Sequence, residues 1–225
     1  MKPTVVMTQT KMYTNQSVNI VHLPLIETKS LSFDIQVLGE HYQWLLFSSQ
    51  NAVRHFLPYM SQVSYEKVAV IGIKTAQICE KYGIEVDFIP HNYSQEGFLE
   101  SFNAESSDKI LIPSSKGARP LLNQSLRQRG HSTCKIDLYE SAPHIQNVQK
   151  VYRLINQGCV DVITFASSSA VNAFFDYEAT LVNQYDIVTI GSQTRQTVED
   201  YGMQCKTADI QTLDAMIEKI IETRD

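Results

Sequence analysis

The chain contains the segment Phe47-Ser48-Ser49-Gln50-Asn51-Ala52-Val53 and, further along, the similar segment Phe165-Ala166-Ser167-Ser168-Ser169-Ala170-Val171. Two more pieces recur in the same order and at nearly the same separation: Ile71–Thr75 returns as Ile190–Thr194, and Tyr82–Gly83 returns as Tyr201–Gly202. A solenoid would repeat many units of about 20–50 residues. A single duplication instead predicts two similar domains, with matching loops on either side of a cleft.

Composition places the chain among ordinary globular proteins. Its 225 residues suit one large or two small domains, at roughly 100–150 residues each. A net charge of −5 argues against a dedicated nucleic-acid surface, which is normally basic. No apolar run approaches the ~18–20 residues of a membrane span, and residues 1–8 turn polar too soon for a signal peptide. We therefore predict a soluble, cytoplasmic protein whose partners include neither nucleic acid nor membrane.

The cysteines and histidines form no recognisable metal site. The four cysteines are widely spaced without a Cys-x-x-Cys pair, and the six histidines contain no His-x-x-x-His pair. We read the cysteines as reduced thiols. Gly-x-Gly-x-x-Gly, Walker and Ser/His/Asp-like patterns are also missing from the sequence. The residues alone therefore predict no metal site.

Short apolar runs alternate with longer amphipathic stretches. The strand-like runs are Trp44–Phe47, Val68–Ile71, Ile110–Ile112, Val160–Phe165 and Ile187–Ile190, and each leads through small polar residues or glycine into a helical pattern. Helices are expected to end at Gly83, Gly130 and Gly202, because glycine tolerates a left-handed C-cap. Repeated strand–helix units predict an α/β fold with parallel sheets covered by helices on both faces.

Two segments break this rhythm, Val21–Glu27 and Lys135–Pro143, which look extended and lack a following helix. If they pair, they form a two-stranded connection between the domains. We then expect a discontinuous first domain of residues 1–22 and 145–225, an inserted second domain of residues 34–133, and a linker of residues 23–33 and 134–144.

Strand alternation within the second extended segment gives an expectation for one tyrosine. Ile136 and Leu138 would face one side, and Asp137 and Tyr139 the other. Tyr139 would then face the cleft. The alternative is that Tyr139 does not face the cleft and is an amphipathic side chain that packs against its neighbours.

In parallel α/β sheets, ligands bind beyond the carboxyl ends of the strands. Polar residues open helices at such positions in both halves; the candidate binding residues are Ser48, Ser49, Asn51, Ser167 and Ser168, with Thr75 and Thr194 at two further helix starts. Helix starts offer unpaired N–H groups and a partial positive charge, which attract carboxylates or phosphates. The alternative is plain N-capping, for which these residue types are preferred.

Two cations follow another predicted strand. Lys116 and Arg119 lie within Ser114–Pro120, and a guanidinium can hold a carboxylate bidentately. The alternative is an ordinary solvated pair. The residues alone predict a two-domain α/β protein with a cleft lined by groups that bind anions.

The same motifs resemble the uroporphyrinogen-III synthase family over nearly the whole chain. The landmarks are Leu45–Val53, Ile71–Ala76, Gly83–Pro90, Leu111–Pro113 with Ala118–Pro120, Leu138–Ser141, Phe165–Val171 and Ile190–Thr194. Their order and spacing together are specific. Two departures from the family pattern are Ser48, where threonine is common, and Ser114, where arginine is common.

This resemblance implies a reaction and roles for individual residues. The substrate is hydroxymethylbilane, a linear tetrapyrrole with eight carboxylates, which is cyclised with loss of water and inversion of the last pyrrole ring through a spiro intermediate. Tyr139 is the leading proton donor by motif match, with Thr75 and Thr194 as secondary hydroxyls. No cofactor is implied, and a transient contact with the preceding pathway enzyme is expected. The competing hypothesis is a non-catalytic sensor or carrier for a polycarboxylate.

Overall fold

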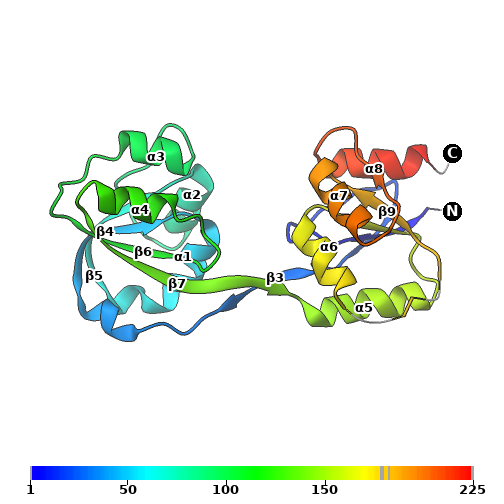
Figure 1. Ribbon diagram of the computed structural model, residues 1–225, viewed down its shortest axis with the longest axis horizontal. Helices are drawn as coiled ribbons and strands as arrows, with labels where there is room; N and C mark the ends of the chain where they lie inside the picture. Colours follow the sequence, from blue (N-terminus) through cyan, green and yellow to red (C-terminus); the bar gives the residue numbers. More distant parts are fainter. Residues whose placement is uncertain (1, 178–179, 182, 224–225) are drawn as a thin grey trace. The chain divides into compact units, whose positions relative to one another are not determined.

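A computed structural model describes residues 2–177, 180–181 and 183–223 of the chain. The chain divides into two compact units, which we call unit 1 (Met1–Glu27 with Ala142–Asp225) and unit 2 (Thr28–Ser141). Unit 2 is thus one continuous stretch between the two parts of unit 1. In Figure 1, unit 1 accordingly contains both ends of the colour scale.

Unit 2 is built on a five-stranded sheet in the order β3-β7-β6-β4-β5. The strands are β3 (Ile26–Ser30), β4 (His41–Phe47), β5 (Ser64–Val70), β6 (Lys109–Ser115) and β7 (Ser132–Pro143). The pairs β4–β5, β4–β6 and β6–β7 are parallel. The helices are η1 (Ile35–Gly39), α1 (Gln50–Phe56), η2 (Leu57–Gln62), α2 (Ile73–Lys81), α3 (Gln95–Ser101) and α4 (Leu121–Gln128).

Helices cover both faces of this sheet. Leu45 and Phe47 of β4 pack in one core cluster with residues of α1 and α2. Trp44 and Leu46 point the other way and pack with residues of α3 and α4. Because both faces are covered, the strand reads as a continuous apolar run rather than as an alternating one.

Unit 1 repeats this architecture with a five-stranded sheet in the order β10-β9-β8-β1-β2, in which all pairs are parallel. The strands are β1 (Thr4–Met7), β2 (Asn19–His22), β8 (Val162–Phe165), β9 (Asp186–Thr189) and β10 (Lys206–Thr207). The helices are α5 (Ile145–Asn156), α6 (Ser168–Phe175), α7 (Ser192–Asp200) and α8 (Leu213–Glu222). The predicted class, two similar α/β units with parallel sheets, is confirmed.

The sequence repeat corresponds to a structural repeat. The strand–helix pair β4–α1 of unit 2 matches β8–α6 of unit 1, and β5–α2 matches β9–α7. Both second helices are followed by a left-handed glycine, Gly83 with φ 70° and Gly202 with φ 74°. A side chain would be strained at either position, so these glycines end the helices as expected.

The first extended segment, Val21–Glu27, spans the end of β2 and the start of β3, and the second, Lys135–Pro143, lies within β7. Strands β3 and β7 are neighbours in the sheet of unit 2. The N–H of Leu31 donates to the carbonyl of Leu138 (2.9 Å), and the N–H of His144 donates to that of Leu25 (2.8 Å), so the two segments run antiparallel. Since β7 also pairs with β6, it belongs to a sheet as well as to the predicted linker. The linker role of residues 23–33 and 134–144 stays a prediction.

A β-bulge in β7 changes the direction in which Tyr139 points. Ser114 of β6 pairs with Asp137, but the next residue, Ser115, pairs with Tyr139, so Leu138 is the extra residue. Tyr139 therefore packs in the same core cluster as Ile136 and Leu138. The expectation that Tyr139 shares the polar side of Asp137 is wrong, because strict alternation fails at a bulge.

The remaining sequence-based expectations concern membranes and thiols. Within the described part of the chain, no helix is both long and apolar enough to cross a membrane. All four cysteines are free; Cys79 is buried and Cys159 is exposed. Burial raises the pKa of the Cys79 thiol to about 11, so this side chain acts as a small apolar group.

Candidate functional site

The carboxyl ends of four parallel strands place several predicted residues at one edge of unit 2. Ser48 and Ser49 follow β4, Thr75 lies in the first turn of α2 after β5, and Lys116 follows β6. The backbone N–H of Lys116 donates to the carbonyl of Tyr139 on β7 (2.8 Å). This edge is where open α/β sheets bind ligands.

Ser49 and Tyr139 form the central contact of this edge. Ser49 is the N-cap of α1, and its Oγ accepts the backbone N–H of Ala52 (3.1 Å). The same Oγ shares a hydrogen bond of 2.9 Å with the hydroxyl of Tyr139. Tyr139 is only 6% exposed. The phenol is therefore held against the start of a helix, with its hydroxyl at the carboxyl edge of the sheet.

His55 is a member of this cluster that sequence reasoning missed. Its ring stacks on the ring of Tyr139, with centroids 4.7 Å apart and an interplanar angle of 7°. Its Nε2 lies 2.8 Å from Thr28 Oγ1, and its Nδ1 lies 2.9 Å from Ser30 Oγ. Burial lowers the pKa of His55. A lone histidine in a helical pattern carries no motif, so only the fold reveals this contact.

Three other predicted residues of this edge are not part of the hydrogen bond between Ser49 and Tyr139. Among the described residues, Ser49 is the hydrogen-bond partner of the Tyr139 hydroxyl, and Ser48, Asn51 and Thr75 are not. Thr75 is 5% exposed. Asn51 Oδ1 accepts a hydrogen bond from the Arg54 side chain (3.3 Å).

The two predicted cations are paired with carboxylates of the chain itself. Lys116 Nζ lies 3.2 Å from Glu140 Oε2. Arg119 donates to both oxygens of Glu96, at 2.8 and 3.4 Å, and this hydrogen bonding lowers the pKa of Glu96. Arg119 does hold a carboxylate bidentately. A ligand carboxylate would compete with that of Glu96 for the guanidinium.

In unit 1 the matching edge forms a small cavity. The cavity has a volume of about 330 Å³, and three of the predicted site residues line it: Ser167, Ser168 and Thr194. Ser167 caps α6 by accepting the N–H of Ala170 (3.3 Å), as Ser49 caps α1. Thr197 Oγ1 donates to Ser168 Oγ (2.7 Å). The repeat therefore places the same capped turn in both units, but Ser49 alone meets a tyrosine.

Gln211 is a second residue that sequence reasoning missed. Its side chain lines the cavity and lies over Gly191, where an added Cβ would come within 2.9 Å of the Gln211 amide nitrogen. Glycine at position 191 therefore allows this close approach. The equivalent Gly72 in unit 2 has no such neighbour, since its nearest contact would be Tyr93 Cβ at 3.8 Å.

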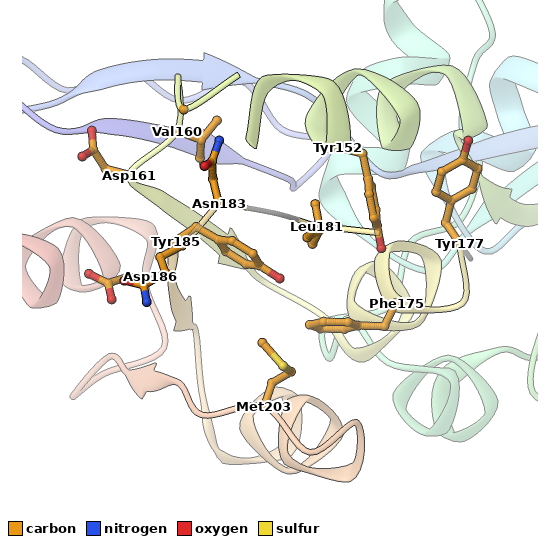
Figure 2. A pocket seen from close by; sticks show the side chains of 12 residues that line it. Tyr152, Val160, Asp161, Phe175, Tyr177, Leu181, Asn183, Tyr185, Asp186 and Met203 are labelled. Atoms are coloured by element: carbon orange, nitrogen blue, oxygen red, sulfur yellow. The ribbon is translucent and has the colours of Figure 1, made fainter. Parts of the chain in front are cut away.

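A larger cavity of unit 1, about 1070 Å³, lies at the opposite edge of the sheet (Figure 2). Val160 and Asp161 on its wall precede β8, and Asp186 begins β9. The aromatic side chains around it include Tyr152, Phe175 and Tyr185. None of the predicted site residues lines it. Because it lies at the amino ends of the strands, it is separate from the edge that carries the serine and threonine turns.

Within the described residues, no group of three histidine, cysteine, aspartate or glutamate side chains is arranged to hold a metal ion. The polar groups at the two carboxyl edges are hydroxyls, amides and backbone N–H groups and, in unit 2, the ammonium of Lys116. Such groups suit an anionic organic ligand better than a transition metal.

A comparison with protein families agrees with this geometry. The model of the family described as uroporphyrinogen-III synthase HemD matches residues 9–218. The chain belongs to the uroporphyrinogen-III synthase HemD family. Members of this family are lyases of tetrapyrrole biosynthesis, and the matched residues include both carboxyl edges.

Individual members of the uroporphyrinogen-III synthase family resemble the chain over most of its length. The chloroplastic enzyme of Oryza sativa is 27% identical over 92% of this chain and 73% of its own, and the enzyme of Synechococcus elongatus is 28% identical over 71% and 66%. The crystal structure of the Helicobacter pylori enzyme covers 100% of both chains, with a TM-score of 0.65 at 18% identity. At this identity the structure supports the fold.

Proposed function

We propose that this chain cyclises hydroxymethylbilane to uroporphyrinogen III, with loss of water and inversion of the terminal pyrrole ring. The observation that carries the proposal is the family match over residues 9–218, which includes both units. The reaction is a dehydrating ring closure without net oxidation, so it requires no redox cofactor.

Substrate binding is proposed to depend on the carboxylates. The starts of α2, α6 and α7 lie at the carboxyl edges, where backbone N–H groups and the helix dipole favour negative charge. The cavity of about 330 Å³ in unit 1 suits one acidic side chain of the substrate better than the whole tetrapyrrole. The residues proposed to contact carboxylates are Ser48, Ser49, Asn51, Lys116, Arg119, Ser167 and Ser168.

Tyr139 is proposed to assist the departing hydroxyl. A phenol with a pKa near ~10 is a weak acid at neutral pH, so its role is a hydrogen bond that strengthens as the carbon–oxygen bond breaks. Ser49 Oγ hydrogen-bonds the phenol oxygen. The hydroxyl leaves with a proton as water, and closure of the macrocycle returns one proton, so the overall change is the loss of one water. Thr75 and Thr194 are proposed as secondary hydroxyls.

Orientation supplies the rest of the proposed rate enhancement. Uncatalysed closure gives the uninverted type I isomer, so the protein must hold the chain where the terminal ring reacts at its substituted carbon. A cleft between the units that holds both ends of the substrate stays a prediction. A cytoplasmic location and a transient contact with the enzyme that supplies the substrate also stay predictions.

The test is a coupled assay with freshly generated hydroxymethylbilane, followed by isomer analysis after oxidation of the products. Mainly type III product supports the proposal. Mainly type I product, combined with tight binding of the tetrapyrrole, would favour a carrier for a polycarboxylate.

A further inference from the structure

We propose that His55 is a positioning residue that holds the ring of Tyr139 so that its hydroxyl stays directed at Ser49. The inference rests on the proposed function, because it gives His55 a part in the same reaction. His55 is half-buried, and the role proposed for Tyr139 has so far involved only Ser49.

The rings of His55 and Tyr139 are in direct contact. They lie almost parallel, at 7°, with centroids 4.7 Å apart. His55 comes from the last turn of α1, and Tyr139 comes from β7. A parallel stack against one face of the phenol blocks rotation of the tyrosine side chain toward that face. The stack therefore limits the positions that the hydroxyl can reach.

His55 is itself held in place by two hydroxyl groups. Thr28 and Ser30 lie two residues apart on β3, so their side chains emerge on the same face of the strand. Each hydroxyl hydrogen-bonds one ring nitrogen of His55. A neutral imidazole has one donor and one acceptor nitrogen, and a hydroxyl can serve either. Both contacts can therefore form together with an uncharged ring, which fixes its plane.

Helix α1 contacts Tyr139 at two points. Ser49, at the start of the helix, meets the hydroxyl, and His55, in the last turn, meets the ring face. Because both contacts come from one short helix, the phenol has a defined position relative to the helix start. Misplacement of a catalytic group by about 1 Å can cost ~10²-fold in rate. Loss of the His55 ring is therefore expected to lower kcat without removing any group that touches the substrate.

The kinetic test compares His55→Ala, Tyr139→Phe and the double variant. We expect His55→Ala to lower kcat by roughly 10–100-fold with little change in KM. In the Tyr139→Phe background the same change should have almost no further effect, because no hydroxyl remains to be positioned. His55→Phe keeps a stacked ring and should retain more activity than His55→Ala.

The matched control is His41→Ala. His41 is an exposed histidine of the same unit, and both of its ring nitrogens also have hydrogen-bond partners, the Ser64 hydroxyl and the Glu66 carboxylate. It does not stack on Tyr139. It should leave kcat unchanged. Independent effects that multiply in the double variant would overturn the inference, as would a lowered melting temperature with normal kcat. If His55→Ala fails to fold, His55→Leu, which fills the space but removes the planar ring that stacks on Tyr139, replaces it in the same cycle.

A readout independent of activity completes the test. In protein labelled with ¹³C at tyrosine Cζ, the Tyr139 resonance is assigned by its loss in Tyr139→Phe. It should move in His55→Ala and stay in place in His41→Ala; an unmoved resonance in His55→Ala would overturn the inference. Failure of the proposed function would be seen instead in the unchanged protein, which would then form no excess type III isomer, and the inference would fall with it.

Discussion

The hydroxyl of Tyr139 lies 2.9 Å from Ser49 Oγ, the atom that also accepts the N–H of Ala52 at the start of α1. One serine therefore caps a helix and holds a phenol. The equivalent serine of unit 1, Ser167, caps α6 in the same way but contacts the Ser169 hydroxyl instead (3.1 Å). This asymmetry makes the unit 2 edge the place where reaction chemistry is expected.

Replacement of Tyr139 by phenylalanine tests the proton-donor proposal. The ring and its stack on His55 remain, and one hydrogen bond is lost, so the free energy of unfolding should fall by only about 0.5–1.5 kcal/mol. We expect kcat to fall by roughly 10²–10³-fold at most, the range for one acid or one charge-stabilising donor. Residual product should still be mainly the type III isomer, because ring placement depends on many contacts.

The comparison for this variant is Thr75→Ala and Thr194→Ala in the same assay. Both threonines are 5% exposed, so the three changes are matched in burial. If kcat is near normal in Tyr139→Phe but falls steeply in either threonine variant, Tyr139 is not the proton donor. If no variant changes kcat beyond a few-fold, no single side chain is the acid.

Ser49→Ala separates the capping role from the role toward the tyrosine. Loss of an N-cap costs about 1 kcal/mol, so Ser49→Ala and Ser167→Ala should lower the free energy of unfolding by similar amounts in denaturant titrations. Only Ser49→Ala also removes a contact of Tyr139. We therefore expect a clearly larger loss of kcat for Ser49→Ala, and equal kinetic losses would argue against a special role for the pair.

The sequence predicted the parts of this site that follow from local chain geometry. N-capping, the alternative considered for the polar helix starts, is what Ser49 and Ser167 do, and it follows from the sequence because it is a local interaction. The repeat then predicted two similar sheets. The left-handed turns at Gly83 and Gly202 were predicted for the same local reason.

The contacts that were missed depend on tertiary register. Alternation placed Tyr139 beside Asp137, but the bulge at Leu138 reverses its side, and a bulge has no signal in this sequence. The stack of His55 on Tyr139 joins residues from α1 and β7, whose proximity follows from sheet order rather than from spacing. Pairing of Arg119 with Glu96 is likewise non-local.

Glu96→Gln tests whether Arg119 binds a substrate carboxylate. Because Arg119 lowers the pKa of Glu96, this carboxyl is ionised at neutral pH and competes with any incoming carboxylate. Removal of its charge should lower KM and tighten product binding. Arg119→Ala should do the opposite. Both effects should shrink at high salt, since exposed charges are screened within ~8–10 Å; identical KM values in the two variants would exclude Arg119 from binding.

Treatment with a chelator tests the expectation that no metal takes part. The described residues offer no cluster of three metal-binding side chains, and the proposed chemistry uses a phenol and orientation. Activity should be unchanged after dialysis against EDTA. Loss of activity that one divalent ion restores would contradict this expectation.

The most direct measurement is the isomer ratio of the product with substrate in large excess over protein. Freshly generated hydroxymethylbilane is mixed with increasing protein, and the oxidised products are separated. A catalyst should raise the total rate in proportion to its concentration and yield mainly type III isomer over many turnovers. Only type I product, or type III product that never exceeds the amount of protein, would contradict the proposed synthase activity.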